Sequence, residues 1–260
     1  VQEYYEVAIE AGLDILVIQG TVISAEHVST TVEPLNLKEF IAEVPVPTVV
    51  GGCASYSTGL HLMRTGAVGV LVGVGPGAAC TTRGVLGIGV PQATAIADVA
   101  AARSQHMLET GEYVNVIGDG GMRTGGDISK AIACGADAVM IGSPLARAKE
   151  APGRGYHWGM ATFHSSLPRG TRVTTVQDGT MEEILLGPAH ENDGTFNLMG
   201  ALRTSMATTG YEDIRSFQRA EMMIAPALMT EGKKLQTEQA VGMGSNGRAA
   251  VSAGVGVADD

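Results

Sequence analysis

Short runs of apolar residues recur along the first part of the chain, and each is bordered or closed by glycine. Three of these runs follow a helix end, a glycine and a short turn, as in Thr65-Gly66-Ala67-Val68 before 69–72. Apolar runs without polar interruption are typical of strands that are covered on both faces, as in parallel sheets. The pattern predicts five strands, at residues 15–18, 48–52, 69–72, 114–118 and 138–141.

Helices are predicted between these strands, at residues 37–43, 57–65, 91–110 and 126–134. Such alternation is typical of a doubly wound sheet or of a (β/α)8 TIM barrel. The strands end in Gly, Cys or Asp at the same end, which favours a barrel with a ring of active-site loops. A barrel closes with eight strands, so we expect this α/β chain to supply the C-terminal five β/α units of a barrel. About three further strands would precede Val1. Without them, the sheet would have open edges.

The composition changes after this part of the chain. Residues 151–167 contain Gly, Pro, His and the only Trp without a clear period, which indicates a loop or flap over the site, at about 151–172. A short strand and a helical turn are predicted within 172–184, and short helices at 200–207 and 211–220. We therefore expect a partial-barrel catalytic domain at 1–230 and a mobile tail at 231–260.

Composition and charge exclude several classes of function. The 260 residues are 45% hydrophobic and carry a net charge of −10, which argues against a nucleic-acid or anionic-membrane partner. No apolar run approaches the roughly 20 residues that span a bilayer. The three cysteines lack zinc-ligand spacing, which favours a reduced, cytoplasmic protein.

Cys80 is the strongest candidate for chemistry. It lies in a glycine-paced loop, GVGPGAACTTR, just after the strand at 69–72, where barrels carry their catalytic residues. The neighbouring Arg83 and main-chain amides favour a nucleophilic thiolate. The alternative is a buried cysteine without a chemical role, which suits Cys134 well and leaves Cys53 undecided.

Two later loops suit a phosphate ester. Gly118-Asp119-Gly120-Gly121 and Gly142-Ser143 close the last two predicted strands, and barrels commonly bind phosphate at this place through backbone amides. Gly121, Gly142 and Ser143 are the candidate donors, and the Asp119 carboxylate suits the two hydroxyls of a ribose. The alternative is that the glycines only form turns and Asp119 is a cap.

Taken together, these motifs resemble the IMP dehydrogenase/GMP reductase family. The resemblance covers about residues 1–151 and resumes at 200–203. HWGMAT, LPRGTR and GALRTSMATTGY are similar to the IMP-dehydrogenase-related branch of actinobacteria and cyanobacteria. The other motifs that carry it are the Cys80 loop with GIGVPQ, GDGG with GGDI, VMIGS and EAPG. The resemblance implies a (β/α)8 barrel and a homotetramer.

The resemblance also implies roles for individual residues. Cys80 would add to carbon 2 of an IMP- or GMP-type purine nucleoside monophosphate, beside the catalytic Thr82. Asp119 would bind the ribose. The other implied contacts are Gly121, Gly142 and Ser143 to the phosphate, Met140, Met160 and Ala161 to the base, Gly52, Gly73 and Gly75 to NAD(H) or NADP(H), and the carbonyls of Gly75, Gly77 and Cys80 to potassium.

Several positions depart from the family pattern. Ala78 replaces a phosphate-binding serine, Gln19 replaces an aspartate that contacts the nicotinamide, and Cys53 replaces an asparagine. Arg169 occupies the catalytic position that the family fills with Glu or Gln.

The flap bears on the direction of the reaction. Only residues 162–167 separate the base-reading segment from Pro168-Arg169-Gly170, without the Arg-Tyr pair that activates water in IMP dehydrogenases. General-base catalysis contributes roughly 10²–10⁴-fold, so its loss favours NADPH-dependent reduction of GMP to IMP. IMP oxidation to XMP with NAD remains the alternative, with Arg169 or His157 activating water. A nucleotide-binding regulator without turnover and a flavin-binding barrel are the other hypotheses.

Overall fold

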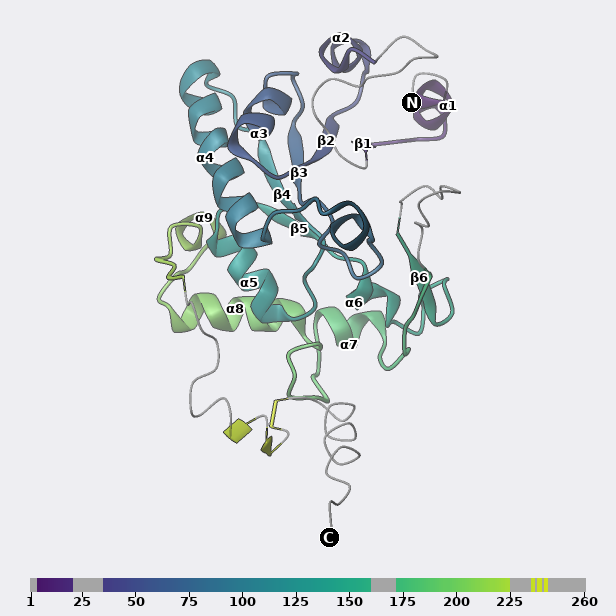
Figure 1. The fold of residues 1–260 in the computed structure, drawn as a ribbon, viewed down its shortest axis with the longest axis vertical. Coiled ribbons are helices and arrows are strands. Elements are labelled where there is room, and N and C mark those ends of the chain that lie inside the picture. Colours follow the sequence, from purple (N-terminus) through teal and green to yellow (C-terminus); the bar gives the residue numbers. More distant parts are fainter. Residues whose placement is uncertain are drawn as a thin grey trace.

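The computed structural model describes residues 4–20, 35–159, 172–224, 235–236, 238–239 and 241–242. Its main sheet is parallel throughout, and its strands lie side by side in chain order (Figure 1). This order has no reversal, so it is the order of a barrel wall and not of a doubly wound sheet. The five predicted strands are confirmed as β1 (Leu16–Gln19), β2 (Thr48–Cys53), β3 (Gly69–Val72), β4 (Asn115–Asp119) and β5 (Ala138–Met140).

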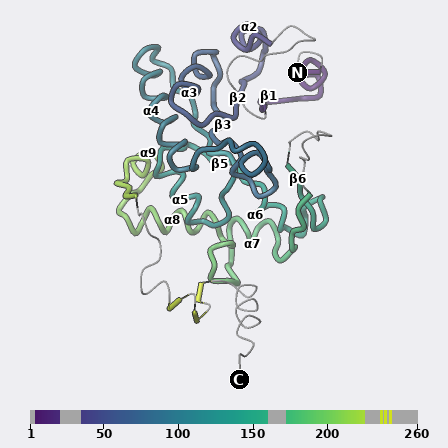
Figure 2. Tube along the Cα trace, in the orientation of Figure 1, coloured from purple at the N-terminus to yellow at the C-terminus, as the bar shows by residue number. Residues whose placement is uncertain are grey.

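The helices between the strands are also confirmed. The tube in Figure 2 shows the chain alternating between sheet and helix along this part. Side chains accept hydrogen bonds at two helix starts, where Asn36 caps α2 and Ser55 caps α3. The helices are α1 (Tyr5–Glu10), α2 (Leu37–Glu43), α3 (Tyr56–Met63), α4 (Gln92–Thr110) and α5 (Gly125–Ala133).

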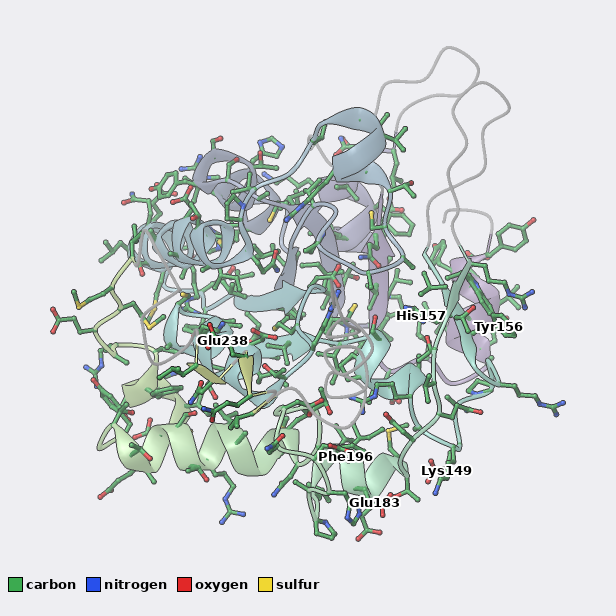
Figure 3. All side chains as sticks on the ribbon, turned by 60° about the horizontal axis from the view of Figure 1, so that its bottom comes forward. Lys149, Tyr156, His157, Glu183, Phe196 and Glu238 are labelled. Carbon is green, nitrogen blue, oxygen red and sulfur yellow. The ribbon has the colours of Figure 1, made fainter. Side chains whose placement is uncertain are left out.

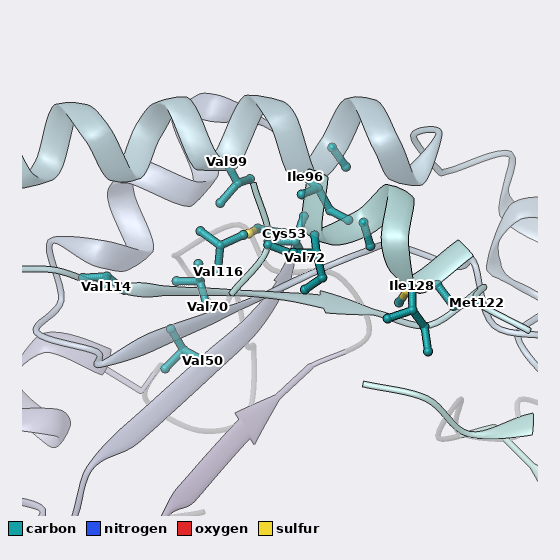
Figure 4. Close-up of a cluster of buried hydrophobic side chains, with 14 of the residues drawn as sticks. Val50, Cys53, Val70, Val72, Ile96, Val99, Val114, Val116, Met122 and Ile128 are labelled. Carbon is teal, nitrogen blue, oxygen red and sulfur yellow. The ribbon is translucent and has the colours of Figure 1, made fainter. Parts of the chain in front are cut away.

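One face of the sheet forms the hydrophobic core against the helices. Val50, Val70 and Val116 come from three adjacent strands and pack with Ile96 and Val99 of α4 (Figure 4). Strand side chains alternate between faces, so the residues next to these valines point the other way. On that opposite face the side chain of Val17 in β1 is 46% exposed.

Among the residues that the structure describes after β5, the chain adds a hairpin and four helices. They are α6 (Ser143–Ala146), the antiparallel strands β6 (Tyr156–Trp158) and β7 (Arg172–Thr174), α7 (Met181–Leu185), α8 (Leu198–Thr208) and α9 (Ile214–Phe217). The strand and helical turn predicted within 172–184 and the two later short helices are confirmed.

Within the predicted loop or flap, Tyr156–Trp158 forms a strand that the sequence did not indicate. The side chains of Tyr156, His157 and Trp158 alternate between the two faces of this strand. All three are aromatic, so the sequence shows no alternation of apolar and polar residues there. The flap itself stays a prediction. The remainder of the predicted flap, 160–171, lies outside the described residues, as does most of the predicted tail at 231–260. None of the described helices is long and apolar enough to cross a membrane.

Candidate active site

A cavity of about 310 Å³ opens at the carboxyl ends of β1 to β4. It brings together seven residues that the sequence predicts for catalysis, ribose, cofactor or potassium: Cys80, Thr82, Asp119, Gly52, Gly73, Gly75 and Gly77. Its size is at the small end of the range for ligand sites in proteins. The candidate site therefore lies where a barrel places its active site.

The Cys80 thiol is held by the loop that follows β3. A turn places the Cys80 N–H 3.0 Å from the Gly77 carbonyl oxygen, and Cys80 Sγ donates to Thr82 Oγ1 at 3.3 Å. Thr82 begins a single π-helical turn, η1 (Thr82–Leu86), and is 1% exposed. The hydroxyl beside the thiol therefore has a fixed place, while the sulfur faces the cavity.

Arg83 supports the same loop in a way that the sequence did not indicate. Its Nε donates to the Val74 carbonyl at 3.1 Å and its Nη2 to the Val90 carbonyl at 2.6 Å. These carbonyls lie near the two ends of the segment that connects β3 with α4, so the guanidinium joins the ends of this connection. Both of these hydrogen bonds go to the main chain rather than to the thiol.

Asp119 faces Gln19 across the cavity. Gln19 Nε2 donates to Asp119 Oδ2 at 2.6 Å. Burial raises the pKa of the Asp119 carboxyl, and the hydrogen bond from Gln19 acts in the opposite direction. The carboxylate still has oxygen lone pairs that can accept from a ribose.

Glycines allow the strand ends around the cavity to approach one another. A Cβ on Gly52 would meet the carbonyl oxygen of Gly73, and a Cβ on Gly73 would overlap that of Asp119. Any side chain at either residue would separate the strands. These glycines thus let the carboxyl ends of neighbouring strands lie close together beside the cavity.

Gln92 is a positioning residue to which sequence reasoning assigned no role. From the start of α4, its Nε2 donates to the Val72 carbonyl at 2.6 Å and to the Asp119 carbonyl at 3.3 Å. It therefore joins the ends of β3 and β4. A glutamine directly after Pro91 at a helix start was the signal available in the sequence.

The residues predicted for phosphate lie at the ends of β4 and β5 and do not line the cavity itself. Gly121 lies against Pro76, which does line it. Gly142 precedes α6, and Ser143 is the first residue of that helix. Met140 pairs with Asp119 in the sheet and is 37% exposed.

Ser143 has a partner on the hairpin. Its hydroxyl lies 3.1 Å from His157 Nε2, and His157 Nδ1 lies 2.6 Å from Thr175 Oγ1. His157 and Tyr156 follow each other on β6 (Figure 3) but lie on opposite faces of it, since Tyr156 is exposed and stacks with Arg172. The sequence proposed His157 as an activator of water. Its hydrogen bonds lie instead at the predicted phosphate end.

Gly159 continues this strand to the cavity. A Cβ at Gly159 would come 2.9 Å from the Ala79 carbonyl oxygen, so the segment passes closely beside the cysteine loop. Met160 and Ala161, the predicted contacts to the base, and the catalytic candidate Arg169 follow it in the sequence, and all three lie outside the described residues.

The other two cysteines have surroundings unlike that of Cys80. Cys53 is buried, its thiol donates to the Leu71 carbonyl at 3.5 Å, and burial raises its pKa to about 12. Burial also raises the pKa of the Cys134 thiol. Both therefore favour the neutral thiol, and of the three cysteines Cys80 alone lines the cavity.

The predicted potassium site rests on main-chain carbonyls. That of Gly77 already accepts the Cys80 N–H at 3.0 Å, and its second lone pair is available to a cation. The part of the chain that the structure describes holds no cluster of His, Cys, Asp or Glu side chains suited to another metal. Potassium binding stays a prediction.

Comparison with known proteins agrees with this geometry. A family model described as the IMP dehydrogenase / GMP reductase domain matches residues 1–234. An uncharacterized oxidoreductase of Mycolicibacterium smegmatis is 52% identical over 220 residues, which cover 83% of this chain and 59% of that protein. An inosine-5'-monophosphate dehydrogenase of Thermoplasma acidophilum is 37% identical over 225 residues, covering 81% of this chain and 44% of that protein.

A solved structure extends the similarity to the fold. The crystal structure of an IMP dehydrogenase/GMP reductase-like protein from Corynebacterium glutamicum aligns with a TM-score of 0.79 at 50% identity, covering 86% of this chain and 59% of that one. The chain thus spans about three fifths of the length of these actinobacterial relatives. On the family match and these similarities together, the chain belongs to the IMP dehydrogenase/GMP reductase family.

Proposed function

We propose that the intact protein is a purine nucleotide oxidoreductase that reduces GMP to IMP with NADPH. The observation that carries this proposal is the contact of Cys80 Sγ with Thr82 Oγ1 in a cavity that also holds Asp119. A nucleophilic thiol beside a carboxylate suited to ribose fits covalent attack on the base of a nucleotide. Reduction also needs no activated water, which agrees with the short segment 162–167 and its lack of an Arg-Tyr pair.

Cys80 carries out the covalent steps of the proposed reaction. The Cys80 thiolate attacks carbon 2 of the purine, and the bond from carbon 2 to the exocyclic nitrogen breaks as that nitrogen takes a proton and leaves as ammonia. Hydride then enters carbon 2 of the thioimidate, and the carbon–sulfur bond breaks to give IMP and the thiolate again. One proton and one hydride are consumed, and one ammonia is released.

Thr82 orients the attacking sulfur, and Asp119 orients the nucleotide. The Thr82 hydroxyl accepts from the thiol at 3.3 Å and directs the sulfur. The Asp119 carboxylate accepts from the ribose hydroxyls, which fixes the distance between the sugar and the sulfur. Gly121, Gly142 and Ser143 are our candidates for the phosphate.

The dinucleotide would lie near Gly52 and Gly73, which line the cavity. A bound NADPH supplies the hydride. The same proposal includes a preference for NADPH over NADH, a potassium ion on the Cys80 loop, a homotetramer and a cytoplasmic location. The preference for NADPH follows from the proposed direction of the reaction. The family resemblance supports potassium and the homotetramer, and three free cysteines support the cytoplasmic location.

Oxidation of IMP to XMP with NAD is the second candidate. It uses the same thiol and the same nucleotide contacts, and the relative from Thermoplasma acidophilum is named as an enzyme of this reaction. It additionally requires a residue that activates water, and Arg169 is our candidate.

An absorbance assay of reduced nicotinamide separates the two. We expect the intact protein to consume NADPH with GMP and to form no NADH from IMP, NAD and potassium. Cys80→Ala should lower the rate by about 10³-fold or more while nucleotide still binds. Cys134→Ala, which also removes a thiol but away from the cavity, is the matched control and should retain the wild-type rate.

Each contrary result has a meaning. NADH formation from IMP would transfer the proposal to dehydrogenation. Tight nucleotide binding without turnover in either assay would indicate a regulator. Unchanged turnover in Cys80→Ala would exclude the covalent mechanism, and a yellow, flavin-containing protein would leave Cys80 without its role.

A further inference from the structure

The hydrogen bond between Gln19 and Asp119 joins strands that are not neighbours. Gln19 ends β1 and Asp119 ends β4, with β2 and β3 between them. In a flat sheet, three strand spacings would separate them by about 14 Å. The observed 2.6 Å contact therefore requires the sheet to curve around the cavity, which both residues line.

The importance of this hydrogen bond follows from the ionisable groups that line the cavity. Among the described residues that line the cavity, Asp119 and Cys80 are the ionisable groups, and none is a lysine or arginine. Burial, which raises the pKa of the carboxyl, is opposed by the amide of Gln19. A carboxyl that took up a proton would lose acceptor capacity toward a ribose.

Glutamine suits this task better than a cation would. Its amide donates one hydrogen bond to Oδ2 and occupies one of about four lone-pair sites of the carboxylate. An arginine would hold both oxygens in a fork and compete with the ribose. A glutamate at this position would have the same length as glutamine, but its negative charge would repel the Asp119 carboxylate.

We propose that Gln19 is a positioning residue, which orients the Asp119 carboxylate toward a ribose and keeps it in its ionised, hydrogen-bond-accepting form. This inference rests on the proposed function, since it assumes that the nucleotide presents its ribose to Asp119. It assigns to Gln19 two properties of the intact protein. They are the pH below which nucleotide binding weakens and the discrimination between ribonucleotides and 2′-deoxyribonucleotides.

The first test needs no nucleotide. NMR titration of the Asp119 side-chain carboxyl in the intact protein should show its pKa moving upward in Gln19→Ala, because the opposing hydrogen bond is lost. It should move further upward in Gln19→Glu, which retains the length but adds a like charge. Gln105→Ala is the matched control, because Gln105 also donates to a carboxylate, that of Glu109 at 2.9 Å, but on the surface of α4.

The second test uses GMP, IMP and their 2′-deoxy analogues by calorimetry across pH. In Gln19→Ala we expect about 3- to 10-fold weaker binding of the ribonucleotides, a smaller ratio between ribo and deoxy affinities, and onset of weakening at a higher pH. A purely structural role for Gln19 would weaken both sugars equally and leave the ratio unchanged.

The outcomes separate the inference from the proposed function. An unmoved Asp119 titration in both Gln19 variants would overturn the inference even where the nucleotide binds. Wild-type protein that binds neither GMP nor IMP would overturn the proposed function and the ribose part of the inference, while the titration would still decide whether Gln19 holds the carboxylate. A shifted titration with a reduced ribo-to-deoxy ratio supports both.

Discussion

Asp119 carries a negative charge in a cavity whose described lining has no basic side chain, and this has an energetic consequence. Because burial raises its pKa, the folded protein holds a proton there more tightly than the unfolded chain does. The protonated Asp119 carboxyl stabilises the fold fully at pH values below its pKa in the unfolded chain. This stabilisation is lost as the pH rises through the pKa that the carboxyl has in the folded protein. At neutral pH the ionised carboxylate therefore destabilises the fold.

Asp119→Asn should consequently separate stability from binding. At neutral pH the variant should unfold at a higher urea concentration than the wild type, and this gain should vanish at a pH low enough to protonate Asp119. GMP should bind about 10- to 100-fold more weakly, since a hydrogen bond to a charged acceptor is lost. Urea titrations at two pH values and calorimetry measure the two effects. A variant that is less stable at neutral pH, or that binds GMP as the wild type does, contradicts this account.

For single residues, the sequence predicts which side chains lie at the candidate site better than it predicts which of them contact one another. Cys80 lies in the loop after β3 and Asp119 is the last residue of β4, so their place at the carboxyl end of the sheet was predictable. The bond of Asp119 with Gln19 was not, because it joins residues 100 positions apart through curvature that no local pattern encodes. The main-chain contacts of Arg83 were missed because a guanidinium near a thiol suggests electrostatics first.

Among the elements, the hairpin of β6 and β7 has two different faces. Tyr156, Trp158 and Arg172 form the exposed face, where the guanidinium lies 4.7 Å and 5.8 Å from the two ring centroids. His157 points the other way, to Ser143 and Thr175. The hairpin thus connects the predicted phosphate end of the site with the segment at Gly159 that enters the cavity.

His157→Phe keeps an aromatic ring but removes both hydrogen bonds. We expect it to weaken GMP binding about 10-fold, the loss of about 1.4 kcal/mol, because the Ser143 hydroxyl is no longer directed toward the phosphate. Guanosine, which has no phosphate, should bind as it does to the wild type. Tyr156→Phe alters the outer face of the same strand and serves as the control. An equal loss for GMP and guanosine would show that His157 acts through the fold of the hairpin.

For the whole molecule, the C-terminal part is attached to the barrel wall through α5 and α8. Gly125, at the start of α5, is buried beneath Ala201 and Leu198 of α8. Gln218, just after α9, donates to the Ala136 carbonyl at 2.8 Å in the turn before β5. The sequence predicted both α8 and α9, but not that a buried glycine would set how closely α8 approaches.

Two adjacent glycines test this attachment with the same chemical change. A Cβ on Gly125 would overlap the Cβ of Ala201, whereas a Cβ on Gly126 has Thr124 Oγ1 as its nearest neighbour at 3.8 Å. Gly125→Ala should therefore lower the free energy of unfolding by about 1–3 kcal/mol through overpacking. Gly126→Ala should raise it by up to about 1 kcal/mol, because alanine favours the helix. Urea denaturation of both variants measures the contrast.

The sign of the difference decides whether α8 is packed in solution as it is in the structure. Both glycines lie in the first turn of α5, so the helical preference of alanine raises stability at either residue by a similar amount. Opposite signs would therefore arise from the contact with α8 alone. Equal stabilisation by both substitutions would mean that α8 does not press on Gly125. In that case the C-terminal helices would be held to the barrel by other contacts, such as that of Gln218.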